Sequence, residues 1–161
     1  MITYDNGYLF DNIKESNILI PLVVNTYGRW DVTNNLSTPI GRYFTKAKNS
    51  YNKWCKEKVD TKREIFFELG ETQIVKCESQ RFPDLYIANM LSQAGIFYSE
   101  VANFSMMNFD RCLSTVVRFC EDNNLQIKTT KENFGFGKWE VINQSLERYF
   151  ENVTCTIYAN K

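Results

Sequence analysis

Residues 18–25 read Ile-Leu-Ile-Pro-Leu-Val-Val-Asn, and this stretch decides the expected fold. The segment Ile18–Val24 is the longest apolar run in the chain. A short run that is apolar at every position is typical of a strand buried on both faces, in a sheet covered by helices on each side. Pro21 argues partly against this interpretation, because proline donates no hydrogen bond to a neighbouring strand. The run is also far too short to span a bilayer.

Outward from this run, strand and helix patterns alternate along the chain. The predicted strands are Ile2–Tyr4, Tyr8–Phe10, Ile18–Val24, Thr72–Glu78, Leu85–Leu91, Leu125–Thr130 and Val153–Tyr158, and the predicted helices are Pro39–Lys56, Asn108–Asn123 and Lys138–Phe150, with a loop over Lys131–Gly137. This alternation predicts an α/β fold of three layers, α/β/α, around a mixed and mostly parallel central sheet. With no repeat or linker, we expect a single domain over residues 1–161.

Charge and cysteine content exclude several classes of function. The chain has 19 basic and 19 acidic side chains and no block of one sign, so a partner such as duplex nucleic acid is not expected. Its 5 cysteines form no CxxC pair and it has no histidine, so we expect buried thiols, no metal site and no cofactor. The N-terminus lacks a signal-peptide pattern, which favours a cytoplasmic protein without membrane contact; the oligomeric state stays open.

Two segments follow predicted strands and carry the candidate ligand site, because ligands of such sheets bind beyond the carboxyl ends of the strands. Residues 25–31 read Asn-Thr-Tyr-Gly-Arg-Trp-Asp, in which Asn25 presents both a donor and an acceptor to sugar hydroxyls. The alternative is that Asn25 closes a local turn and Gly28 merely turns the chain. Residues 131–140 contain Gly135-Phe136-Gly137, whose backbone N–H groups could face a phosphate, or which simply connect a strand to a helix.

The order of short motifs adds a resemblance that covers nearly the whole chain. The motifs are Ile2-x-Tyr4-x-x-Gly7-x-Leu9-Phe10-Asp11, Val23-Val24-Asn25, Gly28-Arg29-Trp30, Tyr51-Asn52-Lys53-Trp54, Leu69 to Val75, Tyr86 to Met90, Gln93 to Ile96, Gly137 to Glu140 and Thr156-Ile157-Tyr158. In this order the sequence resembles macrodomains of the ADP-ribose-1''-phosphate phosphatase type, a branch common in bacteria and phages. The resemblance implies binding of an ADP-ribose-type small molecule and a cleft between the two segments.

Both segments depart from the family pattern. The glycine-rich stretch that usually follows the Asn is here Asp31 to Asn35, without glycine, and Tyr8 stands where many members have an acidic adenine-reading residue. Gly135 takes what looks like the place of a catalytic Asp of related hydrolases. The candidate ligand contacts are Tyr8, Asp11, Asn25, Gly28, Arg29, Trp30, Asn89, Asn133, Phe134, Gly135, Phe136, Gly137 and Tyr158. We expect one ring among Tyr8, Phe134, Phe136 and Tyr158 to stack on the base, unless Phe134 and Phe136 cap the core.

Three functions follow from this resemblance. The first is a binder of an ADP-ribose-type, NAD-derived nucleotide without efficient turnover, which in a phage setting could sequester a signalling nucleotide. The second is a hydrolase that removes a phosphate or an ADP-ribosyl group. Its base or nucleophile-positioning group would come from Glu132, Asp31 or Asn25, the candidates near the two segments, with Glu132 as the catalytic candidate. The third is a protein-interaction module whose pocket has decayed. The absence of histidine, the side chain best matched to neutral pH, favours the first.

Overall fold

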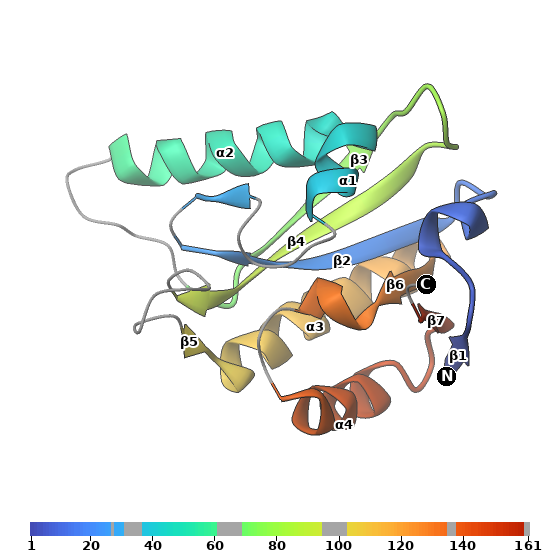
Figure 1. Ribbon diagram of the computed structural model, residues 1–161. Coiled ribbons are helices and arrows are strands. Elements are labelled where there is room, and N and C mark those ends of the chain that lie inside the picture. Colours follow the sequence, from blue (N-terminus) through green and yellow to red (C-terminus); the bar gives the residue numbers. More distant parts are fainter. Residues whose placement is uncertain (27, 31–36, 61–68, 95–102, 135–137, 160–161) are drawn as a thin grey trace.

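The computed structural model describes residues 1–26, 28–30, 37–60, 69–94, 103–134 and 138–159, which form a sheet between two layers of helices (Figure 1). Its strands are β1 (Ile2–Asp5), β2 (Ile18–Asn25), β3 (Thr72–Cys77), β4 (Leu85–Ala94), β5 (Asn103–Phe104), β6 (Gln126–Thr130) and β7 (Cys155–Tyr158). Its helices are α1 (Ser37–Tyr43), α2 (Thr45–Asp60), α3 (Met106–Asn123) and α4 (Trp139–Tyr149), with short 3-10 helices η1 (Leu9–Asn12) and η3 (Lys131–Phe134).

The strands lie in the order β1-β7-β6-β2-β4-β3, and β5 also pairs with β4. All pairs from β1 to β4 in this order are parallel, whereas β3 and β5 run antiparallel to β4. This confirms the predicted mixed and mostly parallel sheet. Because five neighbouring strands point the same way, their carboxyl ends meet at one side of the sheet, here named the carboxyl edge.

The strand β2 is buried on both faces, as its sequence predicts. All eight of its residues are buried. Ile20 and Leu22 pack into a core with α1 and α2, while Leu19 and Val23 pack into a second core with α3 and α4. Figure 1 shows these helix pairs on opposite sides of the sheet. Pro21 is tolerated because β2 pairs with β6 only through Ile18 and Leu19, so the proline lies beyond that ladder.

Two of the predicted elements are wrong in detail. Residues Tyr8–Phe10 do not form a strand, because the chain turns there into η1, with the Asp11 N–H and the Asn12 side chain both donating to the Tyr8 carbonyl. The predicted helix Pro39–Lys56 is two helices that break at Phe44. Phe44 is fully buried and keeps the helical spacing of the apolar positions, so the periodicity gave no sign of the break.

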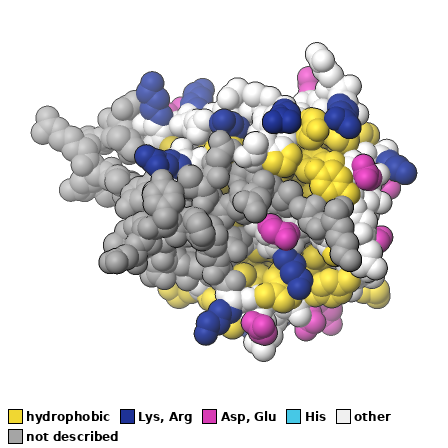
Figure 2. Space-filling view, viewed as in Figure 1, with side chains coloured by type: hydrophobic (Ala, Val, Ile, Leu, Met, Phe, Trp, Pro, Cys, Tyr) yellow, Lys and Arg dark blue, Asp and Glu magenta, His cyan; other side chains and the backbone are white. Residues whose placement is uncertain are grey.

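The face of the molecule shown in Figure 2 carries charges of both signs. In Figure 2, Lys and Arg side chains are interspersed with Asp and Glu across the part of this face that is described. Among the described helices, none combines the length and the apolar character needed to cross a membrane.

All five cysteines are buried and unpaired. Burial raises the pKa of the Cys55, Cys77 and Cys112 thiols to about 11. It raises the pKa of the Cys120 and Cys155 thiols to about 12. The expectation of buried thiols is confirmed, and the folded chain holds them in their neutral form.

We expect substitutions on both faces of β2 to be equally damaging. Leu19→Ala and Leu22→Ala should each lower the free energy of unfolding by about 2–5 kcal/mol, because each leaves a cavity in a different core. Arg118→Ala, at an exposed position of α3, should change it by no more than about 0.5 kcal/mol. Urea unfolding measures all three. A small effect for either leucine would contradict a strand covered on both faces.

We expect the protein to lose stability as pH rises above about 9. The unfolded thiols ionise near their ordinary pKa of 9, whereas the folded thiols stay neutral up to about 11 or 12. Stability from a raised pKa is therefore present below pH 9 and is lost as pH climbs towards the folded values, by up to about 1.4 kcal/mol per pH unit for each thiol. Urea unfolding at pH 7, 9 and 10 measures this loss. Equal stability at pH 7 and pH 10 would contradict the burial of these thiols.

Candidate functional site

Buried polar side chains gather at the carboxyl edge of the sheet. They lie at the ends of β2, β4 and β6 and on η3, the helix that follows β6, and they are Asn25, Ser92, Gln93, Thr130 and Asn133. Each is at most 1% exposed. Polar groups at such depth are normally hydrogen-bonded within the protein. An atom that lacks a partner therefore needs an explanation, such as a ligand or a water molecule.

Several of these atoms have no partner among the described residues. They are the Ser92 hydroxyl, both amide atoms of Gln93, the Thr130 hydroxyl and the Asn133 Oδ1. An unpaired buried polar atom costs about 1–3 kcal/mol. A group of them at the edge where ligands of α/β sheets bind indicates a site that is completed by a ligand or by water.

A β-bulge shapes the middle of this edge. The register between β2 and β4 shifts after Val24, so that Val24 pairs with Leu91 whereas Asn25 pairs with Gln93. Ser92 is the extra residue, and its carbonyl accepts a hydrogen bond of 3.0 Å from the Ser105 N–H. Bulges of this kind are frequent next to functional sites, because they redirect side chains at the end of a ladder.

Asn25 holds the start of the first predicted ligand segment. Its Nδ2 donates to the Arg29 carbonyl at 2.7 Å and its Oδ1 accepts from the Arg29 N–H at 3.3 Å. The hydroxyl of Tyr51 on α2 donates to both the Asn25 carbonyl and its Oδ1, and burial raises the pKa of this phenol. Gly28 adopts a left-handed φ of +72°, and a Cβ there would lie 3.1 Å from the Cβ of Cys55. The turn-closing interpretation of Asn25 and Gly28 therefore describes this geometry, and the expected bond from Asn25 to a ribose stays a prediction.

A cavity of about 290 Å³ lies at the other end of the carboxyl edge, beside β1, β6 and β7. Its walls are formed by Tyr4, Asp5, Asn6, Lys131, Glu132, Ile157, Tyr158 and Ala159. Burial raises the pKa of Tyr158, and the Asp5 and Glu15 carboxylates raise it further. Glu132 is exposed on the wall, and the Lys131 ammonium lies 4.8 Å from the centre of the Trp139 ring. The cavity thus combines the phenols of Tyr4 and Tyr158, the carboxylates of Asp5 and Glu132 and the Lys131 ammonium.

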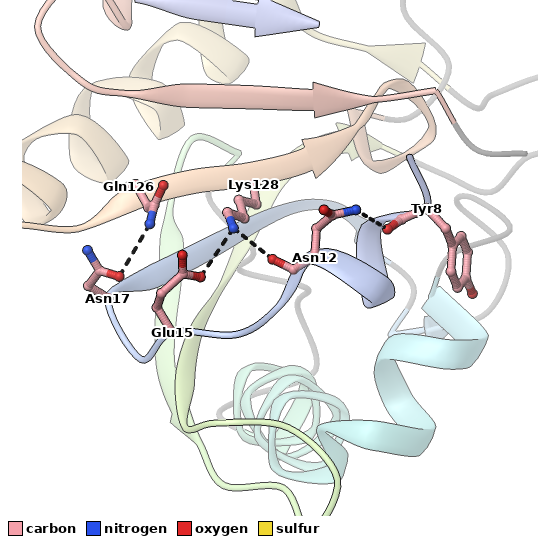
Figure 3. Close-up of polar contacts among 6 residues, drawn as sticks. All are labelled: Tyr8, Asn12, Glu15, Asn17, Gln126 and Lys128. Carbon is pink, nitrogen blue, oxygen red and sulfur yellow. Dashed lines mark hydrogen bonds and ion pairs between the residues drawn. The ribbon is translucent and has the colours of Figure 1, made fainter. Parts of the chain in front are cut away.

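Lys128 anchors the segment that carries Tyr8 and Asp11. Its ammonium donates to the Asn12 carbonyl at 2.7 Å and to the Glu15 carboxylate at 3.2 Å. Figure 3 shows this ammonium between the two acceptors, with the Asn12 amide bonded in turn to the Tyr8 carbonyl. The Lys128 side chain is only 11% exposed, so β6 and the η1 segment are joined by a shielded polar contact.

The remaining predicted residues near the first loop lie in three environments. Tyr8 is half-buried, with its ring 5.4 Å from that of Phe10, and Asp11 is exposed on η1. Arg29 is exposed, although its backbone holds the Asn25 amide. Trp30 is 4% exposed and packs 5.8 Å from the Tyr51 ring, so its indole contributes to the core.

The other predicted residues are partly separated from the edge. Asn89 lies in the middle of β4, where its amide donates to the Ala47 carbonyl and to Gln73, so the structure does not bring it to the carboxyl edge. Phe134 is fully buried and meets Phe109 edge to face at 5.9 Å, which supports the core-capping interpretation for this ring. Gly135, Phe136 and Gly137 lie outside the described residues.

The sequence interpretation missed four residues of this region as site or anchoring residues: Ser92, Gln93, Thr130 and Lys128. A signal for the first three was present, because Ser92 and Gln93 directly follow the predicted strand Leu85–Leu91 and Thr130 ends the predicted strand Leu125–Thr130, each with a polar side chain. Lys128 gave no such signal, since its partners at Asn12 and Glu15 are more than 100 residues away. Among the described residues, no group of three His, Cys, Asp or Glu side chains could hold a metal ion.

Comparison with solved structures identifies the fold. No protein-family model matches the chain, and no curated protein matches it either. The structure is similar to a macrodomain protein from Streptomyces coelicolor (TM-score 0.77, 17% identity, 100% of each chain covered). It is also similar to the macrodomain of Mycobacterium tuberculosis DarG (TM-score 0.72, 19% identity, 100% and 99% covered). A third match is Thermosipho africanus DarTG in complex with ADP-ribose (TM-score 0.67, 13% identity). The matched region covers 98% of this chain and 41% of the DarTG chain. The chain has the macrodomain fold.

We expect Lys128→Met to loosen the η1 segment. The substitution leaves the Asn12 carbonyl without its donor, which should cost about 1–3 kcal/mol of unfolding free energy. The Glu15 carboxylate is 50% exposed, so the loss of its ion pair should add little. Urea unfolding measures the cost, and hydrogen exchange should show faster exchange of the Asp11 amide. Lys14→Met, at an exposed neighbouring position, is the control, and an equal effect of both variants would contradict the anchoring role of Lys128.

Proposed function

We propose that this protein binds an ADP-ribose-type nucleotide at the carboxyl edge of its sheet, without efficient turnover. The observation that carries the proposal is the group of unpaired buried polar atoms on Ser92, Gln93, Thr130 and Asn133. Their cost to the fold is offset when a polar ligand supplies the missing partners. Thermosipho africanus DarTG, which has a similar fold over the length of this chain, is seen in complex with ADP-ribose.

The shape of the site supports a ligand with a ring at one end. The cavity beside β1, β6 and β7 has about the smallest volume that ligand pockets usually have, and Tyr158 on its wall offers a phenol ring. Of the four rings that are candidates for stacking on a base, Tyr8 and Tyr158 remain, since Phe134 is fully buried and Phe136 lies outside the described residues. Asp11, exposed on η1, is the alternative contact to a base.

The same atoms argue against a decayed pocket. A site that no longer binds a polar ligand gains stability when buried unpaired groups are replaced by apolar ones. Four residues with unpaired polar atoms at one edge are therefore better explained by a ligand that still pairs with them. In an interaction module that binds no ligand, nothing would offset the loss of folding stability caused by these unpaired atoms.

Weak or absent catalysis is part of the proposal. The chain contains no histidine, and Glu132, one of two carboxylates on the wall of the described cavity together with Asp5, is the candidate general base of a hydrolase. A protein that binds the nucleotide and releases it unchanged would be suited to sequestering an NAD-derived signal. A hydrolase would instead remove the 1''-phosphate or an attached ADP-ribosyl group.

We expect ADP-ribose to stabilise the protein on binding. At 100 times its dissociation constant it should raise the free energy of unfolding by about 2.7 kcal/mol. Thermal-shift measurements with ADP-ribose, its 1''-phosphate, cyclic ADP-ribose isomers and NAD test this, followed by calorimetry of each ligand that shifts the transition. Thr130→Val should weaken binding about tenfold without loss of stability, because its hydroxyl is buried and unpaired. Thr115→Val, on the exposed face of α3, is the matched control.

Product analysis separates the binder from the hydrolase. The protein is incubated with ADP-ribose 1''-phosphate and with an ADP-ribosylated protein, and the proposal expects less than one turnover per molecule. Multiple turnovers that Glu132→Gln abolishes, with binding retained, would make the protein an enzyme. No thermal shift with any of the ligands would instead support the interaction module.

A further inference from the structure

Gln93 has the least satisfied side chain at the carboxyl edge. It is 1% exposed, and neither its Nε2 nor its Oε1 has a hydrogen-bond partner among the described residues. Its backbone, in contrast, is held on both sides, because Gln93 pairs with Asn25 of β2 and with Phe104 of β5. Its carbonyl also accepts from the Thr26 N–H at 3.1 Å. The fold therefore fixes the position of Gln93 while leaving its amide unpaired.

The other buried or half-buried amides nearby are bonded within the protein. Asn25 bonds to the backbone of Arg29 and to the Tyr51 hydroxyl. Gln73, on β3, donates to the Ser50 carbonyl at 3.0 Å and accepts from the Asn89 amide at 3.1 Å. Asn89 and Asn133 donate through Nδ2 and leave only Oδ1 unpaired. Among the described residues, Gln93 is thus the buried amide with neither polar atom paired.

The chemistry of an unpaired amide restricts what it binds. A primary amide offers donors and an acceptor side by side, so its best partner presents a donor and an acceptor on adjacent atoms. The vicinal hydroxyls of a ribose do this, whereas a phosphate offers acceptors alone and leaves Oε1 without a partner. A base at the cavity beside β7 would lie three strand positions from β4, roughly 14 Å away. Gln93 therefore faces the sugar end of a long ligand.

We infer that Gln93 is a specificity-determining residue, whose amide hydrogen-bonds the vicinal hydroxyls of the distal ribose and distinguishes ADP-ribose from ADP. The inference rests on the proposed function. The sugar contact expected of Asn25 is thereby assigned to its register partner on the neighbouring strand β4, because the Asn25 amide closes its own turn.

Gln93→Met tests the inference, with Gln73→Met as the matched control. Calorimetry gives the affinities of wild type and both variants for ADP-ribose and for ADP, which lacks the distal ribose, and melting without ligand gives their stabilities. Gln93→Met should reduce the preference for ADP-ribose over ADP about tenfold, as expected for lost neutral hydrogen bonds, with ADP affinity unchanged. Its melting temperature should be equal or higher, because an unpaired buried amide is removed. Gln73→Met should melt earlier and keep the preference.

Each other outcome overturns a stated part of the argument. If wild type binds both ligands equally, or if Gln93→Met keeps the wild-type preference, Gln93 does not read the distal ribose and the proposed nucleotide binding still stands. A melting temperature that falls in Gln93→Met, and again in Gln93→Leu, would assign the amide to the fold and overturn the inference. Wild type that binds neither ligand would overturn both the proposed function and the inference.

Discussion

The burial of β2 between two helical layers is the constraint that the rest of the molecule depends on. Its eight residues contribute to both cores, with Ile20 and Leu22 on the α1–α2 side and Leu19 and Val23 on the α3–α4 side. A one-residue change of register would exchange these faces, so the pairing of β2 with β4 and β6 is strongly specified. The same pairing places Asn25, Gln93 and Thr130 at the carboxyl edge. Packing in the core therefore decides where the polar atoms of the site lie.

The edge itself carries a cost in stability, which the proposed ligand would offset. Directly before it, the buried residues of β2 are apolar, and on β4 Asn89 leaves only its Oδ1 unpaired, whereas Ser92, Gln93 and Thr130 carry unpaired atoms at the edge itself. Each such atom costs about 1–3 kcal/mol, a large share of the 5–15 kcal/mol by which a domain of this kind is stable. The two cores on either side of the sheet, dense with aromatic and aliphatic side chains, provide the stability that offsets this cost.

The sequence predicted the layers and the ends of the strands better than it predicted the roles of single residues. The unbroken apolar run at Ile18–Val24 and the helical spacing around Val116 are local sequence patterns. Such patterns predict which faces of a strand or helix become buried in the folded chain. The η1 turn at Leu9 and the break at Phe44 depend on side chains and backbone groups that meet only in the folded chain. Periodicity carries no information about such contacts, and this is why both elements were mistaken.

The internal pairing of the candidate site residues could not be predicted from the sequence, for a related reason. Whether an amide reads a ligand depends on whether the protein has already paired it. Asn25 had the expected position after a buried strand, but its amide meets the backbone of Arg29 four residues later. Gln93 was part of the family-like pattern without a role, and only its lack of a partner distinguishes it. The anchoring role of Lys128 could not be predicted from the sequence, because its acceptors at Asn12 and Glu15 lie more than 100 residues away along the chain.

The spacing of the site along the edge limits the ligand more than any single contact does. The ring-lined cavity lies at β1, β6 and β7, and the unpaired amide lies at the end of β4, with β2 between them. At about 4.8 Å per strand, the interval from β7 to β4 is roughly 14 Å. A lone base with its ribose satisfies one end and leaves the polar atoms of the other end unpaired. A base and a second sugar joined by a diphosphate would reach both ends, and this spacing supports the proposed ADP-ribose-type ligand over a mononucleotide.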